Sequence, residues 1–202
     1  MVKKFLTTIF FLIFFYPLLS ESKIVKGKTA TSDYSMIVTR HYIASDVGNQ
    51  ILLDGGNAID ASVAISFALS VVLPQASPIG GGGFMIIHDE NSDTNYALDY
   101  REMAPKEATE DMFIVNGEVD RKLALESYLS SGVPGTVKGL YIAHQKFGLL
   151  PWKRLISPAL KLARDGFIVT ETLAKSLESN KEKLAKTSDG REIFFNNGSI
   201  LK

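Results

Sequence analysis

The apolar positions of residues 57–72 predict a buried helix. Residues 57–72 are apolar nearly all round, which is typical of a helix enclosed in a large core. A shorter helix is predicted over residues 45–52, and Gly55 suits a left-handed C-terminal cap. Asn57 can cap the longer helix, with Asp60 in its first turn, where negative charge is favoured.

Strands are predicted where short apolar runs lie between turn residues. Residues 84–88 and 96–102 form one pair of runs, and the turn-rich residues 91–95 join them, which predicts a β-hairpin. A further short strand is predicted at residues 36–38. Residues 103–120 are interpreted as a loop that contains an Asn-Gly turn.

Three more helices are predicted from their start signals and apolar spacing. They begin near Pro134, Pro151 and Thr170. His144 lies on the apolar face of the first and is interpreted as a core residue. The tail, residues 193–202, contains a turn. The fold class is therefore α+β, helix-rich with a central β-hairpin, and the chain shows no internal repeat or domain linker.

The first segment has the layout of a secretory signal. Lys3 and Lys4 precede an apolar stretch, Phe5 to Leu19, which is shorter than the roughly 20 residues that a spanning helix needs. Small residues follow, and cleavage is expected after Ser22. Residues 1–22 are thus predicted to be a signal peptide, with an uncleaved membrane anchor as the alternative. Residues 23–202 would then be periplasmic or secreted.

Composition and charge exclude several kinds of site. Lysine and arginine number 22 against 22 acidic residues, and this balance argues against a nucleic-acid-binding protein. The chain has no cysteine, which excludes disulfides, thiolate zinc sites and a cysteine nucleophile. His41, His88 and His144 are scattered among different elements, so neither a metal site nor a cofactor site is predicted.

A run of four glycines, residues 80–83, joins the buried helix to the hairpin. No Lys-Ser or Lys-Thr follows the run, and the order helix–glycines–strand is not that of a phosphate-binding loop. Two interpretations stay open. The run is either a tight connection or a place where the main chain approaches another group closely.

Arg101 is the candidate binding residue. At the end of the second strand, its guanidinium could hold a substrate carboxylate through two parallel hydrogen bonds. A salt bridge to Asp99 or Glu102 is the alternative. No pair of nucleophile and base is visible, and no serine lies in a Gly-x-Ser-x-Gly elbow.

Five runs of residues, taken together in this order, resemble gamma-glutamyltransferases, the gamma-glutamyl transpeptidases. Each run alone is weakly specific, but five in order are highly specific. The runs are Asp54–Ala61, Pro74–Met85, Asp99–Pro105, Ser131–Val137 and Leu162–Phe167.

The resemblance implies an N-terminal-nucleophile hydrolase with a four-layer αββα core, of which this chain would supply a part. In that family the precursor cleaves itself, and the new N-terminal threonine of the small subunit attacks the gamma-glutamyl amide of glutathione or a related compound. The gamma-glutamyl group then passes to water or to an acceptor amino acid or peptide. The resemblance also implies that Arg101 holds the α-carboxylate of that group, with the glycine run nearby.

The matching residues cover only the N-terminal part of the large subunit, so we expect no catalytic residue in these 202 residues. Thr109, Thr136 and Thr170 do not lie in the family's cleavage-site motif. We expect the chain to be inactive alone, its site being completed by the remaining large-subunit and small-subunit segments. One alternative is a related cephalosporin acylase or poly-gamma-glutamate depolymerase. Another is a non-catalytic secreted remnant or gamma-glutamyl-binding module, because the apolar helix 57–72 needs a covering layer.

Overall fold

The computed structural model describes residues 29–76 and 79–201, and the chain divides into two compact units, residues 1–36 and 37–202. The predicted signal peptide lies outside the described residues. The predicted strand at residues 36–38 is wrong, because these residues take no regular structure and pair with no other strand. Within the described part of the chain, no helix is long and apolar enough to cross a membrane.

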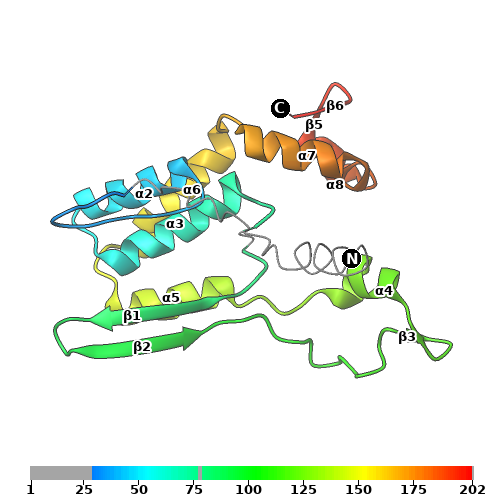
Figure 1. Ribbon diagram of the computed structural model, residues 1–202, viewed down its shortest axis with the longest axis horizontal. Coiled ribbons are helices and arrows are strands. Elements are labelled where there is room, and N and C mark those ends of the chain that lie inside the picture. The colour runs from blue at the N-terminus through cyan, green and yellow to red at the C-terminus, as the bar shows by residue number, and fades with distance from the viewer. Residues whose placement is uncertain (1–28, 77–78, 202) are drawn as a thin grey trace, which may run out of the picture. The chain divides into compact units, whose positions relative to one another are not determined.

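The second unit contains the helices and strands, whose order Figure 1 shows. The helices are α2 (Tyr42–Leu53), α3 (Ala58–Val72), α4 (Arg121–Glu126), the 3-10 turn η1 (Tyr128–Ser130), α5 (Thr136–Phe147), α6 (Trp152–Asp165), α7 (Glu171–Leu184) and α8 (Ser188–Phe194). The strands are β1 (Phe84–Asp89), β2 (Thr94–Asp99), β3 (Ile114–Val115), β4 (Glu118–Val119), β5 (Phe195–Asn196) and β6 (Ser199–Ile200). The helix-rich α+β fold with a β-hairpin is confirmed.

Local signals set the ends of α2 and α3. Gly55 has a φ of 89°, which is the left-handed cap predicted after α2. Asn57 accepts hydrogen bonds from the N–H groups of Ile59 and Asp60, while Asp60 accepts from the N–H of Asn57 at 3.1 Å. This reciprocal capping box starts α3 where the sequence predicts. Helix α2 begins three residues earlier than predicted, because the ring nitrogen Nδ1 of His41 caps it.

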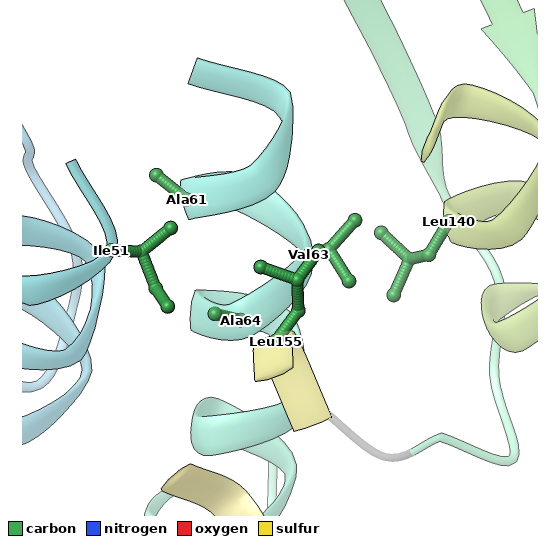
Figure 2. Packing of buried hydrophobic residues seen from close by; sticks show 6 residues of the cluster. All are labelled: Ile51, Ala61, Val63, Ala64, Leu140 and Leu155. Atoms are coloured by element: carbon green, nitrogen blue, oxygen red, sulfur yellow. The ribbon is translucent and has the colours of Figure 1, made fainter. Parts of the chain in front are cut away.

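Helix α3 is the centre of the core. It packs on α2, α5 and α6, and side chains from all four helices meet around it (Figure 2). The six buried residues of this cluster are Ile51, Ala61, Val63, Ala64, Leu140 and Leu155. The covering layer that α3 needs is therefore supplied by this chain.

The hairpin β1–β2 is antiparallel, and its two faces have different surroundings. In its register Phe84 lies opposite Asp99 and Ile87 lies opposite Tyr96. Ile87 packs with Ile59 of α3 and Ala143 of α5, so this face belongs to the core. Side chains alternate along a strand, and the opposite face is open. The predicted second strand ends three residues early, at Asp99.

The structure adds several short elements that the sequence patterns do not predict, among them β3, β4, α4 and α8. Strands β3 and β4 flank the predicted Asn-Gly turn within residues 103–120, which are otherwise irregular. Helix α4 has six residues and no buried one, so it has no apolar period to detect. Helix α8 contains Gly190, a residue that disfavours helix, and the side chain of Thr187 caps it.

The C-terminal elements α7, α8, β5 and β6 share a smaller cluster of apolar side chains. Leu173 and Leu177 of α7 pack with Ile200 of β6. Thr170 caps α7 as predicted, by accepting the N–H of Leu173 at 3.3 Å. The predicted turn in the tail is also present, because Asn197 and Gly198 both have positive φ and join β5 to β6.

Candidate functional site

Arg101 lies two residues beyond β2, with its guanidinium partly open to solvent. Its Nη2 atom is 2.9 Å from Oε1 of Glu102, and the guanidinium carbon is 6.0 Å from the centre of the Phe84 ring. Asp99 does not pair with this guanidinium. Its carboxylate accepts the backbone N–H of Arg101 at 3.0 Å. Of the two predicted ionic partners, Glu102 is therefore the one that pairs with Arg101.

The arrangement at Arg101 fits the capture of a carboxylate. The Arg101 side chain is 53% exposed, and its one ion-pair partner in the described part of the chain is Glu102. A guanidinium offers five N–H donors in a planar fork, so one carboxylate on Nη2 leaves donors for a second. A ligand carboxylate could therefore bind by two parallel hydrogen bonds while the pair with Glu102 persists.

The glycine run approaches other main-chain segments closely. The carbonyl oxygen of Gly81 accepts the N–H of Gly135 at 2.9 Å and of Thr136 at 3.1 Å. Gly83 and Tyr100 exchange backbone hydrogen bonds, with 3.0 Å from the N–H of Tyr100 to the oxygen of Gly83. The close-approach interpretation is confirmed, and the run joins the end of β2 to the start of α5.

Tyr100 anchors the opposite side of this junction. A side chain at Gly135 or Gly139 would collide with Tyr100, so both glycines are needed for α5 to pack against it. Burial raises the pKa of the Tyr100 hydroxyl.

A pocket of about 190 Å³ lies beside Tyr100. It is lined by Ser66, Leu69, Ser70, Ala76, Gly81, Gly82, Tyr100 and Thr136.

The serine hydroxyl groups beside this pocket have structural roles. Ser66 and Ser70 donate to the backbone carbonyls of Ser62 and Ser66, at 2.8 and 2.9 Å, within α3. In residues 29–76 and 79–201, no serine or threonine hydroxyl bonds to a side-chain nitrogen of histidine or lysine. Thr170 is a helix cap, and Thr109 donates to Asp111 on an exposed loop.

The three histidines lie apart, and the described residues contain no cluster of three or more potential metal-ligating side chains. His144 is buried as predicted, with Nε2 2.8 Å from the carbonyl oxygen of Leu150. His88 is exposed at the hairpin end, where hydrogen bonds to Glu90 and then Asn95 raise its pKa. His41 is buried, and burial lowers its pKa.

His41 should make the fold less stable in acid. Because its pKa in the folded state is lowered, the unfolded chain binds more protons below about pH 6.5, and the free energy of unfolding falls as the pH drops. We expect His41→Asn, which keeps a capping side chain, to flatten the dependence of unfolding free energy on pH between about 5 and 7. Urea unfolding at several pH values across this range measures this dependence.

His88→Asn is the matched control with the opposite sign. The pKa of His88 is raised, so its contribution is present at low pH and lost as the pH rises through the folded value. Removing the His88 imidazole should therefore make the free energy of unfolding rise more steeply with pH. An unchanged slope in His41→Asn would show that His41 does not titrate with unfolding in this range.

Comparison with known proteins gives a consistent result. The sequence model of the family described as gamma-glutamyltranspeptidase matches residues 44–202. The chain is 47% identical over 169 residues to the glutathione hydrolase proenzyme of Escherichia coli K12, and 44% identical over 169 residues to that of Bacillus subtilis 168. In both cases the match covers 83% of this chain and 29% of the relative.

A solved structure matches the fold as well. The crystal structure of Helicobacter pylori gamma-glutamyltranspeptidase superimposes with a TM-score of 0.80 at 43% identity, over 85% of this chain and 49% of that one. The chain thus spans under a third of the curated relatives and about half of the solved chain. From the sequence match and the shared fold, this chain belongs to the gamma-glutamyltranspeptidase family.

Proposed function

We propose that this chain supplies the carboxylate-binding part of a site that cleaves the gamma-glutamyl amide of glutathione or a related compound. The observation that carries the proposal is the half-exposed guanidinium of Arg101, held on one side by Glu102 and open on the other. Its role is to bind the α-carboxylate of the gamma-glutamyl group and so to orient the amide for attack.

The remaining chemistry requires groups that these residues do not provide. A threonine nucleophile with its own α-amine as base is proposed to lie in a small subunit, outside these 202 residues. The gamma-glutamyl group would pass from it to water or to an amino acid or peptide acceptor. Arg101 would then bind the same carboxylate in the substrate and in the acyl intermediate, since the α-carboxylate is not altered by the reaction.

Residues 1–22 are proposed to be a cleaved leader, which would direct the chain to the periplasm or out of the cell. Support comes from the basic start, the short apolar stretch and the small residues around Ser22. The chain from residue 23 onward is proposed to be the N-terminal portion of the large subunit.

The alternative of a non-catalytic remnant loses its main support in this structure. That alternative relied on an uncovered apolar helix at residues 57–72, and α3 is instead packed by α2, α5 and α6. An acylase or a poly-gamma-glutamate depolymerase would keep the carboxylate contact at Arg101. These two candidate activities differ from the proposed one in the part of the substrate that lies beyond this carboxylate.

Titration with three matched ligands tests the carboxylate role. The side-chain Nε–H signal of Arg101 should shift with glutathione and with glutaryl-Cys-Gly, which both carry the carboxylate. It should not shift with 4-aminobutyryl-Cys-Gly, which keeps the amine and lacks that carboxylate. Nitrogen-15 NMR of the 202-residue chain measures all three, and the signal is assigned by its loss in Arg101→Lys.

Two results would contradict the proposal. If 4-aminobutyryl-Cys-Gly shifts the Arg101 signal as far as glutathione does, the guanidinium is responding to the glycine carboxylate. If none of the three ligands shifts it, Arg101 does not bind the gamma-glutamyl group in this chain.

A further inference from the structure

Gly82 lies at the junction of three main-chain segments. On one side, Gly83 exchanges backbone hydrogen bonds with Tyr100, and on the other, Met103 and Val133 exchange backbone hydrogen bonds of 3.2 and 2.8 Å. Glu102 lies between these two sets of bonds. Its backbone is therefore held from both directions, directly beside Gly82.

Only glycine fits at position 82. A Cβ atom there would lie 2.5 Å from Oε2 of Glu102 and 2.6 Å from the carbonyl oxygen of Tyr100, and closer still to the backbone nitrogen of Glu102. By contrast, a Cβ atom at Gly80 in the same run would meet nothing within 4 Å. The demand for glycine is thus strong at position 82, where the chain touches Glu102, and absent at position 80.

Glu102 is confined on a second side by Gly132. A Cβ atom at Gly132 would lie 3.3 Å from both Cβ and Cγ of Glu102, which is tight but tolerable. The Oε2 atom of Glu102 is buried and has no hydrogen-bond partner in the described part of the chain, while Oε1 pairs with Arg101. The Glu102 side chain is therefore confined by both glycines, with Gly132 against its Cβ and Cγ and Gly82 against Oε2.

This confinement matters because the pair between Arg101 and Glu102 is partly exposed, with side chains 53% and 34% accessible. Such pairs hold flexible side chains weakly when both partners are free to move. A carboxylate that is already fixed loses less freedom on pairing and gives the guanidinium one preferred orientation.

We propose that Gly82 is a positioning residue for the carboxylate-binding site: by lacking a side chain it fixes Glu102, and through Glu102 it orients Arg101. This assigns to the glycine run a role in ligand recognition. The purpose of the orientation rests on the proposed function, whereas the orientation itself is testable without a ligand.

The test measures rotation about the Nε–Cζ bond of Arg101 by nitrogen-15 exchange NMR on the 202-residue chain. Gly82→Ala should speed this rotation by about threefold, the scale expected for loss of a partly exposed ion pair. Gly80→Ala is the matched control and should leave the rate unchanged. Circular dichroism establishes that each variant is folded.

A milder variant keeps the proposal testable if Gly82→Ala does not fold. Gly132→Ala presses on the Glu102 side chain without meeting its backbone nitrogen and should produce a smaller increase in the same rate. The proposal is overturned if folded Gly82→Ala rotates like wild type, or if Gly82→Ala is unfolded and Gly132→Ala rotates like wild type. Failure of glutathione to shift the Arg101 signal would instead count against the proposed function alone.

Discussion

Replacing Asp60 with asparagine is expected to lower the free energy of unfolding by about 3 kcal/mol or more. Asp60 is fully buried, and its carboxylate accepts backbone N–H groups of Asn57, Leu149 and Leu150 at 3.1 to 3.2 Å. Asparagine has the same shape but only one acceptor oxygen. If its oxygen takes the Oδ2 position, all three donors keep an acceptor but the NH2 group faces the N–H of Leu149; in the other orientation the N–H groups of Asn57 and Leu150 lose their partner.

Urea unfolding followed by circular dichroism measures this effect. Asp46→Asn is the matched control, because Asp46 is exposed on α2 and the same substitution there should change stability by no more than about 0.5 kcal/mol. Equal unfolding midpoints for the two variants would show that the carboxylate of Asp60 is not needed to hold α3 to the connection between α5 and α6.

Arg101→Lys is expected to weaken binding of glutathione by about tenfold or more, and Arg101→Ala by at least as much. Lysine keeps the positive charge but presents a single ammonium group, which cannot donate two parallel hydrogen bonds to one carboxylate. The loss in Arg101→Lys therefore isolates the contribution of the fork geometry from that of the charge.

Ligand-observed NMR titration of the full chain gives the dissociation constants. Arg121→Ala removes an exposed arginine from α4 and should leave the constant unchanged, which controls for general electrostatic attraction. A folded Arg101→Ala chain that binds glutathione as tightly as wild type would show that the carboxylate is held elsewhere.

The sequence predicts an element well when its signals are local. The cap of α3 joins residues three apart, the Gly55 cap needs only a positive φ, and the hairpin follows from two apolar runs around a turn. The elements it misses are short, and α4 among them buries no side chain. Their formation depends on packing or capping that leaves no periodic pattern.

At the candidate site, the sequence limits Arg101 to a few interpretations without choosing among them. Both Asp99 and Glu102 are near in sequence, and alternation along a strand places Asp99 on the same face. The strand ends at Asp99, however, and its carboxylate turns to the backbone N–H of Arg101. Glu102 becomes the ionic partner for that reason.

By itself, the sequence determined the caps of α3 and α7, the hairpin and the candidate arginine, because each depends on residue types at short spacing, and it determined the family through five such short runs in order. Only the tertiary structure decided what Asp60 and Gly82 do. Asp60 appears in the sequence as a first-turn acid, yet it binds main-chain donors 89 and 90 residues away. Gly82 appears as one of four equivalent glycines until the segment that carries Glu102 packs against it. Contacts of that range form when the chain folds, and no local pattern records them.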